Sequence, residues 1–166
     1  MKSLESMSIL VTGGGSGIGL GTARYCIERG AKVTICGRRE DKIQAAATEL
    51  GDACRGVTAD ITVAADRQKL LEAAIDHAGQ LDALINNAGN MYRGAITELD
   101  ETALQEVFHT NVIAAMMLTG LCTPSLAQRA KTKQTPPANH DPQPAPRARH
   151  ATAHQHQHTH THTYIH

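Results

Sequence analysis

The glycine-rich stretch Thr12–Gly19 constrains the fold of this 166-residue chain more than any other feature. Its sequence is TGGGSGIG; it follows the aliphatic run Ile9–Val11 and precedes a helical pattern over Leu20–Gly30. Glycines between a strand and a helix let the backbone turn tightly and let a ligand approach without meeting a Cβ atom. The helix N-terminus adds free N–H groups and a positive dipole end, which attract an anion. The stretch therefore predicts a phosphate-binding loop.

Strand-like and helical patterns alternate through the first half of the chain. β-Branched or aliphatic runs predict strands, and apolar residues at helical spacing predict the helices between them. The expected strands are Ile9–Val11, Lys32–Cys36, Cys54–Asp60 and Leu81–Ile85. The expected helices are Ile18–Arg29, Arg39–Leu50 and one that starts at an N-cap, Thr62, and ends at Gly79. Such alternation predicts an α/β fold with a partial, doubly wound (Rossmann) parallel sheet of about four strands and flanking helices.

A longer helix is expected after the loop that contains Gly94, with Asp100 or Thr97 as its cap. Residues at helical spacing predict one common face, made of Leu104, Val107, Phe108, Asn111, Ala115 and Leu118.

Composition narrows the class of protein. The formal net charge is zero, which argues against a general affinity for nucleic acids or membranes. The four cysteines form no CxxC pair, so reduced thiols in a cytoplasmic protein are the simpler interpretation. The N-terminus lacks an apolar signal region, and we expect no stretch long enough to span a membrane.

The composition changes after about Leu126. Five of the six prolines and eight of the ten histidines follow this point, and the chain ends in alternating His and Thr. A low-complexity stretch without apolar periodicity cannot form a core that offsets its chain entropy. We therefore expect a dinucleotide-binding domain over residues 1–126 and a Pro/His-rich tail over 127–166, disordered from about residue 130.

Further polar residues stand at matching places beyond the expected strands. Asp60 ends the third strand, Asn86-Asn87-Ala88-Gly89 ends the fourth, and Asn111 lies in the long helix. Ligands bind beyond the carboxyl ends of the strands in doubly wound sheets. Residues 7 to about 125, with TGxxxGxG at Thr12–Gly19 and NNAG at Asn86–Gly89, resemble the N-terminal part of the short-chain dehydrogenase/reductase family.

That resemblance implies a nicotinamide cofactor and a role for each matching residue. The phosphate loop would comprise Gly13, Ser16, Gly17 and Gly19, with Ile18 near the nicotinamide. The adenine amino group would meet Asp60, with backbone from Ile61. The cofactor would be lined by Asn86, Ala88 and Gly89, Asn87 would hold the central strand, and Asn111 would organise a catalytic water.

The choice of cofactor depends on the end of the second strand. An acid there would accept the ribose hydroxyls of NAD, but this chain has Gly37 followed by Arg38 and Arg39. Guanidinium groups bind a phosphate bidentately, which favours NADP(H), with NAD possible. A simpler interpretation makes both arginines the solvated start of the second helix.

Two other candidate residues also have a simpler interpretation. Asp60 would be a solvated acid at the end of a strand, and the Asn111 side chain would only form hydrogen bonds to the backbone.

The proton-transfer residues of the resembled family are missing from this sequence. Its chemistry uses a tyrosine, a lysine four positions later and an upstream serine, and no Tyr-xxx-Lys follows Asn111. We interpret the chain as truncated, and the residues after about Arg129 as the product of a shifted or alternative reading frame. The family transfers hydride between NADP(H) and an alcohol or carbonyl substrate, and we expect this chain by itself to be inactive in that reaction.

Two further functions remain open from the sequence. One is a non-catalytic NADP(H)-binding or regulatory module that pairs, as a homo- or hetero-oligomer, with a full-length relative. The other is metal binding by the histidine tail, whose alternate imidazoles can chelate Zn, Ni or Cu. We place no metal site in residues 1–126.

Overall fold

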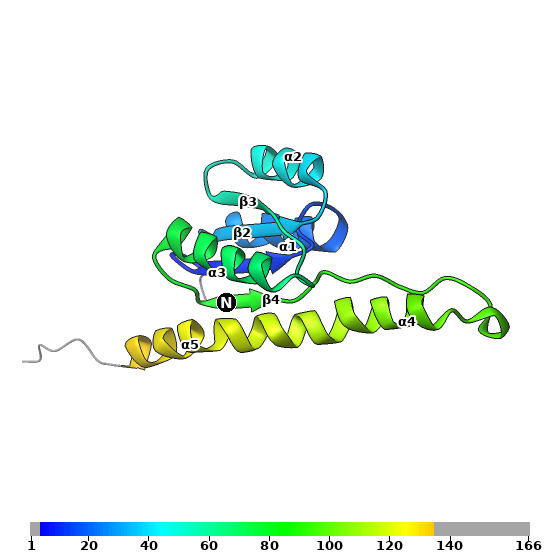
Figure 1. Cartoon of the computed structure of the whole chain (residues 1–166). Coiled ribbons are helices and arrows are strands. Elements are labelled where there is room, and N and C mark those ends of the chain that lie inside the picture. The colour runs from blue at the N-terminus through cyan, green and yellow to red at the C-terminus, as the bar shows by residue number, and fades with distance from the viewer. Residues whose placement is uncertain (1–3, 135–166) are drawn as a thin grey trace, which may run out of the picture. The chain divides into compact units, whose positions relative to one another are not determined.

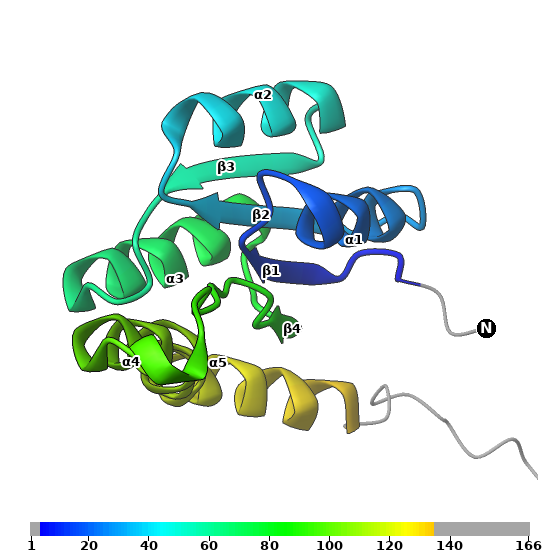
Figure 2. The same cartoon turned by 90° about the vertical axis from the view of Figure 1, so that its right-hand side faces the viewer.

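A computed structural model describes residues 4–134. Its centre is a parallel sheet of four strands in the order β3-β2-β1-β4 (Figures 1 and 2). The strands are β1 Ser8–Thr12, β2 Lys32–Gly37, β3 Cys54–Thr58 and β4 Ala83–Ile85. The chain adds β2 and β3 on one side of β1 and then crosses over to add β4 on the other side. This confirms the predicted partial doubly wound α/β sheet and puts the change of direction between β1 and β4.

Helices connect and cover the strands. The bounds are α1 Gly17–Ile27, α2 Glu40–Leu50, α3 Ala64–Ala78, α4 Glu101–Phe108, a π-helical turn His109–Ala114 and α5 Ala115–Gln134, with a 3₁₀ turn at Ile96–Glu98. One face of the sheet packs on α1 and α2, where Val11 and Ile35 meet Ala23 and Ile43. Because helices cover both faces of the sheet, the strands consist of nearly uninterrupted apolar residues.

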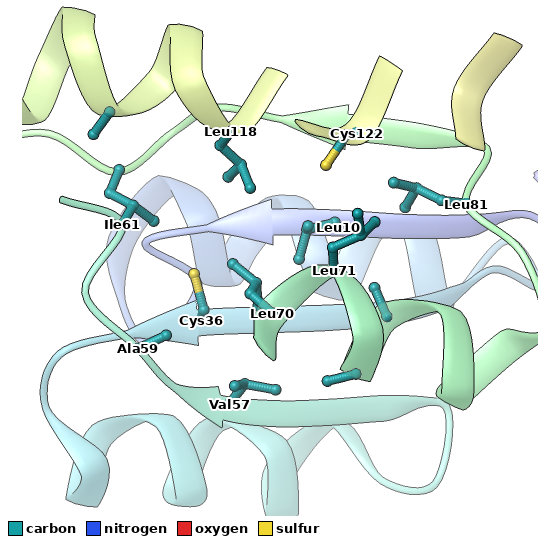
Figure 3. Packing of buried hydrophobic residues seen from close by; sticks show 13 residues of the cluster. Leu10, Cys36, Val57, Ala59, Ile61, Leu70, Leu71, Leu81, Leu118 and Cys122 are labelled. Carbon is teal, nitrogen blue, oxygen red and sulfur yellow. The ribbon is translucent and has the colours of Figure 1, made fainter. Parts of the chain in front are cut away.

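The other face of the sheet packs on α3 and α5. Figure 3 shows Leu70 and Leu71 of α3, and Leu118 and Cys122 of α5, gathered over Leu10 of β1. All four cysteines are free, and three of them (Cys26, Cys36 and Cys122) are buried. Burial of these side chains provides the main stabilisation of the layers on both sides of the sheet.

The ends of two helices match the sequence signals. Gly79 follows α3 in the left-handed conformation, with φ +75°, as expected for a glycine C-cap. Asp100 caps α4, because its Oδ1 accepts from the Ala103 N–H at 2.6 Å. The predicted N-cap at Thr62 is wrong: α3 starts one residue later, after Val63, and the Thr62 hydroxyl donates to Asp60 Oδ1 at 2.7 Å.

The long helical stretch departs from the single predicted face. Ala114, Leu118 and Cys122 are buried, whereas Phe108 is 63% exposed and Asn111 is also exposed. The π-helical turn is the physical reason, because it adds a residue per turn and rotates α4 relative to α5. In Figure 1, α4 also extends past the carboxyl ends of the strands, so less of the sheet is available to cover it.

One helical stretch, Glu101–Gln128, is long and apolar enough to cross a membrane by length and composition. Its best window has a mean hydropathy of 1.3, and 17% of that window is buried. The expectation that no stretch has this length is therefore wrong. A single helix of this kind is weak evidence for a membrane protein.

The end of α5 corrects the predicted start of disorder at about residue 130. The helix continues to Gln134, so residues 130–134 are helical rather than disordered. Alanine, lysine and glutamine are good helix formers, and prolines at 136 and 137 cannot extend a helix. Residues 135–166 lie outside the described part of the chain, and the boundary at 126 stays a prediction.

Candidate functional site

The carboxyl ends of the four parallel strands meet at one edge of the sheet. There the structure has a cavity of about 320 Å³. Its lining comes from the ends of β1, β2 and β3, from the NNAG segment and from the first turn of α2. The lining residues are Gly13, Gly15, Ser16, Cys36, Gly37, Arg38, Arg39, Lys42, Ile43, Ala59, Asp60, Ile61, Asn87, Ala88, Gly89, Asn90 and Thr110. The site therefore lies where the strand order reverses, as is typical of doubly wound sheets.

The glycine loop is pressed against its neighbours, so side chains are excluded. Gly13 has φ +68°, and a Cβ there would lie 2.9 Å from Ala88 Cα. A Cβ on Gly14 would lie 2.6 Å from Ile35 Cβ. No side chain caps the N-terminus of α1, whose N-cap is Ser16, so its first N–H groups remain available to an anion. Both features fit a pyrophosphate held against backbone.

A compact hydrogen-bond network joins the loop to the NNAG segment. Asn87 Nδ2 donates to the carbonyl oxygens of Thr12 at 2.9 Å and Gly13 at 3.2 Å. Thr12 Oγ1 in turn accepts from the N–H groups of Asn87 and Ala88, both at 3.0 Å. Asn87 therefore braces β1 against the end of β4, as predicted, and also lines the cavity.

Positive charge predominates along one wall of the cavity. Arg38, Arg39 and Lys42 line it together with a single carboxylate, Asp60. Lys42 was not predicted from the sequence, although its place three residues beyond Arg39, the N-cap of α2, was a usable signal. This concentration of cations favours an anionic ligand group near the end of β2.

Asp60 is held as a carboxylate. Burial by itself would raise its pKa, but the N–H and hydroxyl of Thr62 both donate to Oδ1, at 2.9 and 2.7 Å. With the electrostatic effects of Arg38 and His109 added, the pKa of Asp60 is lowered from its ordinary value. The group is therefore an acceptor for donors on a ligand at neutral pH.

Asn111 fixes a loop rather than lining the cavity. Its Oδ1 accepts from the Asn90 N–H at 2.9 Å, and its Nδ2 donates to the Asn90 carbonyl at 2.8 Å. It lies in the π-helical turn, a feature frequent at functional sites. The structure thus has the backbone bonding that the sequence left open as the simpler alternative, and any role in organising water stays a prediction.

The predicted residues divide into two groups. Eight of them line the cavity: Gly13, Ser16, Arg38, Arg39, Asp60, Ile61, Ala88 and Gly89. Five do not: Gly17, Ile18, Gly19, Asn86 and Asn111. Ile18 is 82% exposed, and Asn86 donates to the Thr119 hydroxyl at 2.9 Å.

Several lining residues could not be predicted from the sequence. Asn90 and Thr110 reach the cavity from a loop and from the π-helical turn, which no local pattern predicted. Cys36 also lines it, but burial raises the pKa of its thiol to about 12, so it is not a nucleophile at neutral pH. Within residues 4–134, no three His, Cys, Asp or Glu side chains are grouped to hold a metal ion, and the histidine-rich stretch lies outside this range.

The chain is similar to known dehydrogenases and reductases. Its sequence is 33% identical over 131 residues to the 3-phenylpropionate-dihydrodiol/cinnamic acid-dihydrodiol dehydrogenase of Escherichia coli O7:K1, and the match covers 76% of this chain. The K12/DH10B strain protein of the same description is 32% identical. Among solved structures, the 3-ketoacyl-(acyl-carrier-protein) reductase of Brucella melitensis, complexed with NADH, has a TM-score of 0.77 and 33% identity over 80% of this chain.

The match extends over only part of each relative. The chain spans 48% of the length of the Escherichia coli enzymes and 55% of that of the Brucella reductase. The NADH in the reductase and the glycine-lined cavity here together support a nicotinamide cofactor. A family model described as short chain dehydrogenase matches residues 7–133. By sequence, fold and site, the chain belongs to the short-chain dehydrogenase/reductase family.

Proposed function

We propose that this chain binds NADP(H) in the cavity at the carboxyl edge of the sheet. The observation that carries the proposal is the wall formed by Arg38, Arg39 and Lys42 directly after β2. In a doubly wound sheet, the ribose of the adenosine half lies near the end of this strand. The three cations would hold a 2′-phosphate there, and the glycine loop with the free N-terminus of α1 would hold the pyrophosphate.

The charges at this position favour NADP(H) over NAD(H). NAD-selective sites place an acid at the end of the second strand, and Gly37 occupies that place here. Arg38 also lowers the pKa of Asp60, so its positive charge acts on the cavity rather than only on solvent. A guanidinium–phosphate hydrogen bond contributes about 1.5–3 kcal/mol, which corresponds to roughly a 10- to 150-fold preference for NADPH.

A bound NADP(H) would supply the hydride acceptor or donor of an alcohol–carbonyl interconversion. The described side chains would bind and orient it. Asp60 would accept hydrogen bonds from donors of the adenine half, and Asn87, which holds the glycine loop, would fix the place where the pyrophosphate binds. Proton transfer needs a further acid–base group. The sequence has three tyrosines, and none has a lysine four positions later. We therefore propose that these 166 residues alone bind the cofactor without turning over a substrate.

Thermal melts with NADPH and NADH test this proposal. A ligand that binds only the native state at a hundred times its Kd stabilises it by about 2.7 kcal/mol, which raises the melting temperature by about 5–10 °C. We expect this shift with NADPH and a smaller one with NADH at equal concentration. The difference between the two cofactors should shrink in Arg38→Ala, because one of the three cations is removed. Arg29→Ala is the matched control, because Arg29 precedes β2 at the opposite edge of the sheet. No shift at millimolar NADPH would refute cofactor binding.

A second function, regulation by pairing with a full-length relative, is favoured by a separate observation. Phe108, Ile113, Met116 and Met117 are all at least half exposed on the long helical stretch. Within the described residues, β4 has a strand neighbour on one side only. Contiguous exposed apolar surface is typical of interaction sites.

Size-exclusion chromatography with a full-length relative tests this pairing. We expect the two chains to co-elute, Met116→Glu to abolish co-elution, and Lys69→Glu to leave it intact. Separate elution of the unmodified chain would refute the pairing.

We also propose a cytoplasmic location and, as a third candidate function, metal binding by the histidine tail. The location rests on the four free cysteines, which form no CxxC pair in the sequence. The tail contains imidazoles at alternate positions from His154 to His162. Fractionation of cells that express the native gene tests the first, and zinc titration of chains with and without residues 135–166 tests the second.

A further inference from the structure

The first turn of α3 holds the backbone of the segment that follows β3. The Asp66 carboxylate accepts from the Asp60 N–H at 2.7 Å, through Oδ2. The next residue, Arg67, donates from Nη1 to the Ile61 carbonyl oxygen, also at 2.7 Å. The Val63 N–H then donates to the Asp60 carbonyl at 2.9 Å. Two consecutive side chains of one helix therefore bind the backbone of two consecutive residues in the wall of the cavity.

Asp60 and Ile61 line the cavity, whereas Asp66 and Arg67 do not. The hydrogen bonds from Thr62 both use Asp60 Oδ1, and the backbone at Asp60 is fixed by Asp66. The position of the carboxylate therefore depends on groups that a ligand in the cavity does not touch. Charge-assisted hydrogen bonds such as these are shorter and stronger than neutral ones, so they fix the wall firmly.

Arg67 is unusual because its charge is inside the protein. The residue is 9% exposed, and in the part of the chain that the structure describes it forms no salt bridge. Burial of a guanidinium without partners is costly, so the bond to the Ile61 carbonyl offsets part of that cost. If the segment moved away from α3, it would leave a buried charge without its acceptor. This links the position of Ile61 to the packing of α3.

We propose that Asp66 and Arg67 are positioning residues that set the affinity for the adenosine half of the cofactor by holding the Asp60–Ile61 wall. This inference rests on the proposed NADP(H) binding. Arg38 and Asp60 lie close enough to interact electrostatically, so the wall borders the end of the cavity where the cations after β2 would hold the 2′-phosphate. The NNAG segment and Asn90 border the cavity from the β4 side and receive no bond from Asp66 or Arg67 in the described part of the chain.

The test compares two ligands that each represent half of the cofactor. Adenosine 2′,5′-bisphosphate probes the end near Asp60, and reduced nicotinamide mononucleotide probes the other. By calorimetry, Asp66→Ala and Arg67→Met should each weaken the bisphosphate roughly tenfold, because each removes one charged hydrogen bond from the wall. Neither should change the affinity for the mononucleotide more than twofold.

Conservative variants and remote controls separate positioning from general destabilisation. Asp66→Asn keeps an oxygen that can accept from the Asp60 N–H, so it should restore most of the bisphosphate affinity. Asp76→Ala and Arg55→Met are the matched controls: Asp76 is exposed in the last turn of α3, and Arg55 donates to a backbone carbonyl, that of Ala73, away from the cavity. Both should bind the two ligands as the unmodified chain does.

The results that overturn the inference are distinct from failure of cofactor binding. If the unmodified chain binds NADPH and Asp66→Ala binds the bisphosphate equally well, the positioning role is wrong and the proposed function stands. An equal loss of affinity for both ligands would also overturn it. If the unmodified chain binds neither NADPH nor the bisphosphate, both proposals fail. Asp66 is only half-buried, so we expect Asp66→Ala to fold. This variant therefore tests the positioning role even if Arg67→Met does not fold.

Discussion

Two glycines of α1 provide a matched pair for testing how the glycine-rich loop Thr12–Gly19 is built. Gly19 and Gly21 lie two residues apart in the same helix. A Cβ on Gly19 would overlap the Gly13 carbonyl oxygen and lie 2.5 Å from Asn87 Nδ2, whereas one on Gly21 would meet nothing within 4 Å. The same substitution, glycine to alanine, should therefore have opposite effects at the two positions.

The magnitudes follow from helix propensity and from packing. In the open position, Gly21→Ala should stabilise the protein by about 0.5–1 kcal/mol, since alanine loses less backbone entropy on folding. In Gly19→Ala this gain is opposed by overpacking, which costs about 1–3 kcal/mol. Ordinary contact starts at 3.4 Å, so the helix and the loop would have to separate by about 1 Å. Gly19→Ala should thus be about 1–3 kcal/mol less stable than Gly21→Ala.

The assay combines urea unfolding with cofactor binding. The chain has no tryptophan, so far-UV circular dichroism is the suitable probe of unfolding. NADPH fluorescence then reports binding, which we expect to weaken roughly tenfold or more in Gly19→Ala, because the loop that would hold the pyrophosphate is displaced. Equal stability and equal NADPH affinity of the two variants would refute this account of the loop.

Three further outcomes are expected. Asn111→Ala removes both bonds to the Asn90 backbone, so hydrogen exchange at the Asn90 amide should accelerate about tenfold; unchanged exchange would contradict this. In Thr62→Val, the pKa of Asp60 should rise in a ¹³C-detected titration, because a donor to Oδ1 is lost. A carboxyl group whose pKa is lowered by folding stabilises the native state at pH values above its unfolded-state pKa. This stabilisation is lost as the pH falls through the folded-state pKa. Because that pKa is higher in Thr62→Val, the variant should begin to lose stability at a higher pH than the parent protein. Burial raises the pKa of Cys36 to about 12, so iodoacetamide at pH 8 should label it only after unfolding; labelling of the native state would contradict this.

Local signals in the sequence were sufficient for most of the fold. The aliphatic runs before Gly13 and Asn86 became β1 and β4, and Gly79 and Asp100 ended and began helices as predicted. These features depend on backbone conformation and hydrophobic periodicity within a few residues, which the sequence contains directly. The glycine and NNAG motifs also predicted the family, since the spacing of such motifs reflects a ligand and a turn rather than distant packing.

The tertiary structure determined which distant segments meet, which local sequence patterns do not specify. Lys42, Asn90 and Thr110 line one cavity only because α2, a loop and the π-helical turn converge beyond the sheet. Thr62 resembles an N-cap in sequence, yet its hydroxyl binds Asp60 because the chain turns before α3. Exposure of Phe108 likewise follows from the π-helical turn and from the limited extent of the sheet.

The sequence by itself therefore determined the strand–loop–helix units, the glycine-rich turn between β1 and α1, and the family of this protein. Only the tertiary structure decided which side chains share the cavity, and that Asp66 and Arg67 hold its wall without lining it. The physical reason is range: backbone propensity and periodicity act over a few residues, whereas a cavity wall depends on segments that only long-range packing brings together.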